Sequence, residues 1–179
     1  MPTFRTERSR PRLTETSFIV LGLLDMRDVA TPYELKRVAQ MSTSNIWSVP
    51  HTQLYSECAR LAREGLLIEH QEQGGRRRKS YRLTDRGREL LYEWREEPTG
   101  DLYELRDAST LKLFFGGPPA RIAASQVDAH RRQLEVYERM RASLADAPRG
   151  QLLALESGIG HERESVRFWS TVLERERQP

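Results

Sequence analysis

The sequence of 179 residues lacks the features that mark several classes of protein. It contains one cysteine, so it forms no internal disulfide, and its composition gives no sign of an oxidising compartment. Its longest apolar run, residues 18–24, is too short to span a bilayer. No cleavage site of a targeting peptide follows that run, so we expect a cytoplasmic protein without membrane contact.

Motifs for catalysis and for cofactor binding are also lacking. The histidines have no metal-ligand spacing with Cys58, and His161-Glu162 lacks the second histidine that a zinc-binding helix needs. There is no glycine-rich phosphate loop and no nucleophile elbow. We therefore expect no enzyme, no bound metal and no cofactor.

Positive charge is concentrated in one short stretch. The chain carries a net charge of +3, and residues 1–100 account for all of it. Residues 76–88 contain seven arginine or lysine side chains and a single acid, Asp85. Such a run is in general most often a solvated loop beside a solvated helix face, but it would also attract a polyanion.

The elements predicted before this basic run are three helices. Thr14 is placed to cap a first helix that is apolar on most sides, and residues 28–30 form a short connection. Thr31-Pro32-Tyr33-Glu34 is a capping box with proline at the first helical position. A polar turn over residues 41–47 leads to a third helix that begins at Pro50.

The third helix is expected to end at Gly65 and to bury one face. Cys58 lies on that apolar face, where a small core side chain is favoured over a redox switch. Residues 66–72 and 79–83 are predicted to form a hairpin with a Gly-Gly turn, and Thr84 caps a fourth helix.

This order of elements predicts a winged helix-turn-helix over residues 13–97, preceded by a basic flexible arm over residues 1–12. The expected fold class is mainly α with a small β-hairpin. In such a fold the third helix lies in the major groove, and the hairpin, or wing, carries cations to phosphates or the minor groove. The basic run lies where this fold requires positive charge, which makes nucleic-acid binding the favoured interpretation.

The chain resembles PadR-type transcriptional regulators over about residues 13–175. The family's third helix carries a tyrosine in a His-Ser/Thr-Gln-aliphatic-Tyr setting, which Tyr55 matches. Pro50 stands where serine is common, and Ser56 stands where proline often follows the tyrosine. The segments that carry the resemblance are residues 47–55, 61–68, 81–88, Trp94 and 105–115.

Candidate DNA contacts follow from the helix and the wing. His51, Thr52 and Gln53 are expected to meet base edges, since glutamine can bond adenine bidentately and histidine can donate to guanine. Tyr55 and Ser56 are candidates for phosphate contact. The alternatives are that His51 caps the helix and that Tyr55 packs.

The wing supplies a second set of candidates. Arg76, Arg77, Arg78 and Lys79 are expected to contact phosphates or the minor groove. Tyr33, directly after the capping proline, is a further candidate for contact with the DNA backbone.

Residues 101–179 are predicted to form a C-terminal α-helical dimerisation domain. An apolar cluster at residues 111–115 precedes Pro118-Pro119, which begin a long helix to about residue 147. A last helix follows, with Glu162 interrupting its apolar rhythm. Packing against a second subunit is favoured over an intramolecular bundle with the winged domain. The predicted interface residues are Leu111, Phe114, Phe115, Val127, Leu134, Tyr137, Met140, Leu144, Leu155, Ile159, Val166, Trp169 and Leu173.

The residues and the resemblance together predict a homodimeric, sequence-specific regulator of transcription that binds a near-palindromic operator. A two-fold dimer would place its recognition helices roughly 34 Å apart, one turn of DNA. The resemblance implies a repressor released by a small aromatic effector bound near the dimer core. The aromatic side chains that could line such a site are explained equally well by packing; they are Trp94, Phe114, Phe115, Tyr137 and Trp169. An activator of the same family, or a protein-interaction adaptor that uses a winged fold, is the alternative.

Overall fold

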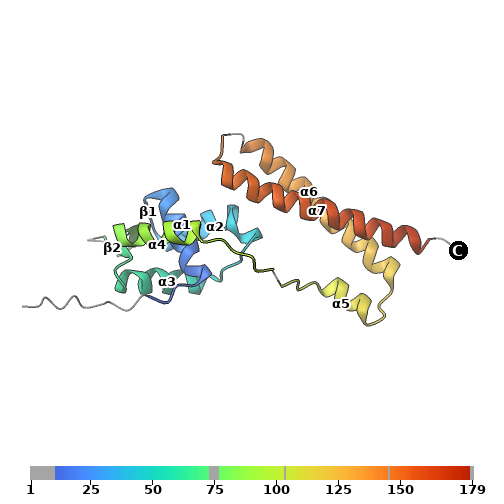
Figure 1. Ribbon diagram of the computed structural model, residues 1–179, viewed down its shortest axis with the longest axis horizontal. Coiled ribbons are helices and arrows are strands. Elements are labelled where there is room, and N and C mark those ends of the chain that lie inside the picture. The colour runs from blue at the N-terminus through green and yellow to red at the C-terminus, as the bar shows by residue number, and fades with distance from the viewer. Residues whose placement is uncertain (1–10, 73–76, 103, 145, 178–179) are drawn as a thin grey trace, which may run out of the picture. The chain divides into compact units, whose positions relative to one another are not determined.

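The computed structural model describes residues 11–72, 77–102, 104–144 and 146–177. The chain divides into two compact units, Met1–Asp101 and Leu102–Pro179 (Figure 1). Residues 1–10 of the expected basic arm and the Gly-Gly turn of the wing lie outside the described residues.

The first unit contains four α-helices and three strands among its described residues. They occur in the order expected for a winged helix-turn-helix, which confirms the predicted fold class. The elements are α1 (Glu15–Arg27), β1 (Val29–Ala30), α2 (Pro32–Met41), the 3₁₀ turn η1 (Thr43–Asn45), α3 (His51–Arg63), β2 (Leu67–Gln71), β3 (Lys79–Leu83) and α4 (Asp85–Glu96).

The sheet has one strand more than the predicted hairpin. Its order is β1-β3-β2, and both pairs are antiparallel. Residues 28–30, expected to be only a connection, include β1, in which Val29 pairs with Arg82 and Ala30 with Tyr81. Two residues are too few to show a strand periodicity, so this pairing is visible only once the chain has folded.

Local capping explains where the first two helices begin. The backbone N–H of Thr14 donates to Ser17 Oγ at 2.9 Å at the start of α1. At the start of α2, Thr31 N–H donates to Glu34 Oε2 at 2.8 Å, and Glu34 N–H donates to Thr31 Oγ1 at 3.3 Å. This reciprocal pair is the predicted capping box, which satisfies two backbone donors that the helix itself cannot.

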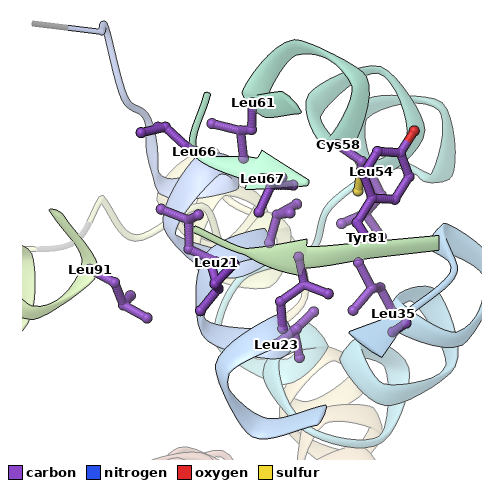
Figure 2. Close-up of a cluster of buried hydrophobic side chains, with 14 of the residues drawn as sticks. Leu21, Leu23, Leu35, Leu54, Cys58, Leu61, Leu66, Leu67, Tyr81 and Leu91 are labelled. Carbon is purple, nitrogen blue, oxygen red and sulfur yellow. The ribbon is translucent and has the colours of Figure 1, made fainter. Parts of the chain in front are cut away.

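The core of the first unit draws apolar side chains from all four helices and from the sheet (Figure 2). Leu21, Leu35, Leu54 and Leu91 are fully or almost fully buried. Cys58 also has no exposed surface, and burial raises the pKa of its thiol to about 12. The predicted placement of Cys58 in the core is confirmed, and its thiol is protonated and inaccessible at neutral pH.

The fourth helix is held by close backbone contact with the beginning of the wing. The Thr84 hydroxyl donates to the carbonyl oxygens of Gly65 and Leu66, and it accepts from Gly87 N–H at 3.0 Å. A Cβ at Gly87 would collide with the Leu66 carbonyl oxygen, so only glycine allows this approach. Trp94 then stacks on Phe18 of α1, with ring centroids 4.5 Å apart.

The second unit consists of α5 (Ala108–Phe114), α6 (Pro119–Ser143) and α7 (Arg149–Arg175). The long helices α6 and α7 lie side by side as a hairpin (Figure 1). The first of them ends at Ser143, before the predicted residue 147. Pro148 is the capping residue of α7, which begins at Arg149, so the break between the helices comes earlier than the expected residues 147–150, and Gly150 is already helical.

Two kinds of contact join the helices of this hairpin. Val127 and Trp169 are buried with Ala123, and Tyr137 packs against Gly158. Glu162 was expected to interrupt the apolar pattern of α7, but its side chain is buried in the contact between α6 and α7. Its carboxylate Oε2 lies 2.6 Å from Nδ1 of His130 on α6, and a polar pair is thereby accommodated in the seam. None of the described helices has a stretch long and apolar enough to cross a bilayer.

Candidate nucleic-acid interface

The third helix presents two faces of opposite character. Leu54, Cys58 and Leu61, at spacings of four and three residues, are buried in the core. The helical period therefore turns the other side outward. The exposed side chains are those of His51, Thr52, Gln53, Tyr55 and Ser56, so the structure brings all five candidates of this helix onto one surface.

A polar network behind α3 fixes its orientation. The fully buried Ser17 hydroxyl of α1 donates to Glu57 Oε1 at 2.6 Å. The Arg60 guanidinium donates to both oxygens of Glu57, at 2.9 and 2.6 Å, and to Ser17 Oγ at 3.1 Å. Arg60 also pairs with Glu64 at 2.7 Å. These directional bonds add to apolar packing and restrict how α3 can rotate against α1.

The network keeps Glu57 in its charged form. Burial by itself would raise the pKa of this carboxyl, but the hydrogen bonds from Arg60 and Ser17 outweigh burial, and the pKa is lowered. The sequence alone does not predict this network. The spacing of Glu57, Arg60 and Glu64 is typical of helical ion pairs, but nothing in the sequence points to Ser17 as their partner.

The beginning of α3 is suited to meet an anion. Pro50 is the capping residue, and no side chain caps the helix. His51 is therefore the first residue of α3 and does not cap it, contrary to that alternative. The amide groups of the first turn and the positive end of the helix dipole favour a negative group here, such as a phosphate.

The five exposed side chains differ in the hydrogen bonds that they can offer. The Ser56 hydroxyl already donates to the carbonyl oxygens of Thr52 and Gln53, at 3.0 and 3.1 Å. Since a phosphate accepts hydrogen bonds and donates none, Ser56 is a weaker candidate for phosphate contact than Tyr55. The Tyr55 ring is about half exposed rather than packed in the core.

The wing keeps two arginines available. Glu72 N–H donates to the Arg78 carbonyl at 3.0 Å where the strands leave the turn, and Arg77 adopts a positive φ of 44°. Both arginine side chains are exposed, and no carboxylate in the described part of the chain pairs with them. Lys79 differs, because its Nζ lies 2.8 Å from Glu69 Oε1. Arg76 lies outside the described residues.

The first turn of α2 lies within electrostatic reach of the wing. Hydrogen bonds from Thr31 lower the pKa of Glu34, and the positive charges of Arg27 and Arg78 lower it further. Tyr33, the neighbour of Glu34, is exposed. The predicted contact residues of the first unit therefore come from three elements, α2, α3 and the wing.

The predicted dimer-interface residues fall into three groups by exposure. Leu111, Phe114 and Phe115 are exposed, the two phenylalanines by 80% and 76%. Val127, Tyr137, Ile159 and Trp169 are already buried within the second unit. The remaining side chains are half-buried; they are Leu134, Met140, Leu144, Leu155, Val166 and Leu173.

No metal centre is formed by the part of the chain that the structure describes, since no three His, Cys, Asp or Glu side chains gather there. The ring centroids of His130 and His161 lie 6.4 Å apart, and Nδ1 of His130 is hydrogen-bonded to Glu162.

Comparison with known proteins identifies similar chains for both units. Residues 20–93 match the model of the transcriptional regulator PadR-like family, and residues 105–175 match the model described as virulence activator alpha C-term. The negative transcriptional regulator PadR of Bacillus subtilis is 25% identical over 174 residues, which cover 87% of this chain and 94% of that protein.

Solved structures agree with the fold. The crystal structure of Bacillus subtilis PadR in complex with operator DNA has a TM-score of 0.78 at 21% identity, covering 89% of this chain and 97% of that one. The same protein in complex with p-coumaric acid has a TM-score of 0.74 at 21% identity, covering 89% and 96%. The Vibrio cholerae virulence activator AphA has a TM-score of 0.68 at 24% identity, covering 89% and 96%.

Replacing Glu57 by glutamine tests the network behind α3. Since Arg60 loses its charged partner in a partly buried site, we expect the free energy of unfolding at pH 7 to fall by about 1–3 kcal/mol. A carboxylate whose pKa is lowered by folding stabilises the fold above its unfolded pKa and loses this contribution as the pH falls. The stability of E57Q should therefore decrease less than that of the wild type below the ordinary carboxyl pKa of 4.5.

Urea denaturation at a series of pH values measures both effects. Glu89→Gln, at an exposed position of α4, is the matched control and should retain the wild-type stability and pH profile. A wild-type pH profile for E57Q would show that the network does not hold the charge of Glu57.

Proposed function

The chain belongs to the PadR-like family of transcriptional regulators, and from this premise we propose that it is a cytoplasmic, homodimeric protein that binds a specific operator sequence. The observation that carries the proposal is the exposed polar face of α3, held rigidly beside a wing with two unpaired arginines. The complex of Bacillus subtilis PadR with operator DNA supports it. The role requires no catalytic group.

The proposed contacts divide into those that read sequence and those that position the protein. Thr52 and Gln53 meet base edges in the major groove together with His51, since their amide, hydroxyl and imidazole groups match the donors and acceptors there. Tyr55 and the first-turn amides of α3 meet phosphate. Arg77 and Arg78 approach phosphates or the minor groove from the wing.

Two further candidates complete the wing and its surroundings. Arg76 is the first residue of the basic run and stays a proposed DNA contact from the sequence, since it lies outside the described residues. Tyr33 stands exposed on α2 and is proposed to meet the DNA backbone. Lys79 was also predicted to contact phosphates or the minor groove, but unlike Arg77 and Arg78 it forms an ion pair with Glu69.

Repression is the proposed direction of control. The Bacillus subtilis relative is a negative regulator, and the likeness to it supports this choice. Activation is the alternative, favoured by the likeness to a virulence activator and by the match of residues 105–175 to a virulence activator segment. An adaptor that binds protein through its winged fold would have no need of Arg77 and Arg78.

Dimerisation is proposed to involve the exposed apolar side chains of α5. A soluble chain rarely leaves two neighbouring phenylalanines in water, and here Leu111, Phe114 and Phe115 are all exposed on one short segment. The side chains already buried between α6 and α7 stiffen the hairpin that presents this segment. A two-fold arrangement would place the two α3 helices on successive half-sites.

Control by a small aromatic acid is part of the proposal. The complex of the Bacillus subtilis relative with p-coumaric acid supports this class of effector. Among the aromatic candidates Trp94 is stacked on Phe18, and Tyr137 and Trp169 are buried, which leaves Phe114 and Phe115 exposed. An effector that prefers one separation of the winged domains would shift the dimer from the DNA-competent form.

The double variant Arg77→Ala/Arg78→Ala tests the wing. We expect weaker binding to operator and to scrambled DNA alike, and a slope of log affinity against log salt that is shallower by about 2, since two phosphate contacts are lost. Fluorescence anisotropy with DNA from upstream of the coding sequence, across a salt series, measures the slope.

Two further variants sharpen this test. Arg175→Ala/Arg177→Ala removes the same charge from exposed positions at the end of α7 and should keep the wild-type slope. Gln53→Ala should cost about 1–3 kcal/mol on operator DNA alone, because it removes base readout. An unchanged slope for the wing variant would favour the adaptor.

Replacing Phe114 and Phe115 together by serine tests the dimer. We expect the mass in solution to fall from that of a dimer to that of a monomer at micromolar concentration, and operator affinity to fall with it. Sedimentation equilibrium measures the mass. Ile46→Ser, at an exposed apolar position in the first unit, should leave the mass unchanged. A persistent dimer in the double variant would exclude α5 from the interface.

Addition of p-coumaric acid tests the effector. We expect it to weaken operator binding by about 5- to 150-fold, the usual range of coupling between two sites. Isothermal titration of the free protein shows whether the acid binds. A ligand that binds and leaves operator affinity unchanged would contradict control by this class of molecule.

A further inference from the structure

The wing contains a charged cluster of Glu69, Lys79 and Tyr81 that the DNA-binding proposal does not use. Glu69 on β2 is paired in register with Tyr81 on β3, and Lys79 lies two residues before Tyr81. Glu69 Oε1 lies 2.8 Å from Lys79 Nζ, and Glu69 Oε2 accepts a hydrogen bond from the Tyr81 hydroxyl at 2.8 Å. Each carboxylate oxygen thus has its own partner on the neighbouring strand.

The rigid partner in this trio is the tyrosine. Tyr81 is 2% exposed and belongs to the core of the first unit, so its hydroxyl has a fixed position. A carboxylate anchored by a fixed donor pays less conformational entropy to hold a lysine than a freely rotating one does. The hydrogen bonds from Lys79 and Tyr81 lower the pKa of Glu69, so the carboxylate is charged at neutral pH and offsets the lysine charge.

The position of Lys79 makes this pairing consequential. It directly follows Arg77 and Arg78 in the basic run, and about half of its side chain is exposed. A lysine at this place would otherwise be free to contact a phosphate. Phosphate contacts raise affinity for every DNA sequence equally, and only base contacts distinguish one sequence from another.

Resting on the proposed function, we propose that Glu69 limits the sequence-independent affinity of the wing for DNA. By holding Lys79, it restricts the wing to its arginine contacts and lowers affinity for operator and other DNA alike. A larger share of the binding free energy then depends on the base readout by α3. Tyr81 acts as the positioning residue that keeps Glu69 in place.

The substitution Glu69→Gln is the test, because it removes the charge and keeps an oxygen that can accept from Tyr81. Released from its partner, Lys79 should add one phosphate contact and steepen the salt slope by about 0.9. The gain in affinity over the wild type should therefore shrink about 3.5-fold between 50 and 200 mM salt. Because a phosphate contact does not depend on sequence, operator and scrambled DNA should gain affinity alike, and the ratio between them should stay that of the wild type.

The matched control is Glu72→Gln, which removes the same charge from the same hairpin. Glu72 is exposed, and no cation in the described part of the chain pairs with its side chain. Glu72→Gln should change affinity for DNA only through the loss of one negative charge, because it releases no lysine to contact a phosphate. The double variant Glu69→Gln/Lys79→Gln should return to the wild-type slope, since the proposed effect passes entirely through Lys79.

The possible failures are distinguishable. A wild-type protein without preference for any DNA would overturn the proposed function. A wild-type protein that binds its operator, with E69Q and E72Q behaving alike, would overturn only the role of Glu69. If circular dichroism shows that E69Q does not fold, the single variant Lys79→Gln tests the role of Glu69 instead. It should keep the wild-type slope, and a slope shallower by about 0.9 would show that Lys79 already contacts phosphate.

Discussion

The orientation of α3 depends on one bidentate ion pair that a third side chain completes from another helix. Arg60 and Glu57 could pair in an isolated helix, but only the buried Ser17 hydroxyl ties that pair to α1. Removing Glu57 takes a hydrogen-bond partner from both Arg60 and Ser17 in a partly buried place. The exposed face of α3 is therefore set by contacts on its buried side, and the candidate DNA contacts on that exposed face take no part in this network.

Much of the fold can be predicted from local signals. The capping box at Thr31 and Glu34, the start of α3 after Pro50 and the bounds of β3 depend on near neighbours in the chain, and each was predicted within a residue. The strand β1 could not be predicted, because two residues acquire strand geometry only by pairing with Arg82 and Tyr81. The role of Glu162 could not be predicted for the same reason, since its partner His130 lies 32 residues away in the chain.

The candidate site shows the same division. Which side of α3 faces outward follows from the spacing of Leu54, Cys58 and Leu61, and the sequence is sufficient for it. Which cations of the basic run remain unpaired does not follow from the sequence. Lys79 and Arg78 are adjacent and both carry a positive charge, yet only the register of β2 against β3 brings Glu69 to Lys79. Charge counts therefore overestimate the positive surface of the wing.

The burial of Cys58 has a practical consequence for studying this protein. The only thiol in the chain is buried in the core and protonated at neutral pH, so electrophilic thiol reagents cannot reach it while the winged unit is folded. A fluorophore can therefore be attached to a cysteine introduced on the surface without first removing the native one. The slow reaction of the native thiol, in turn, would report how often this unit opens.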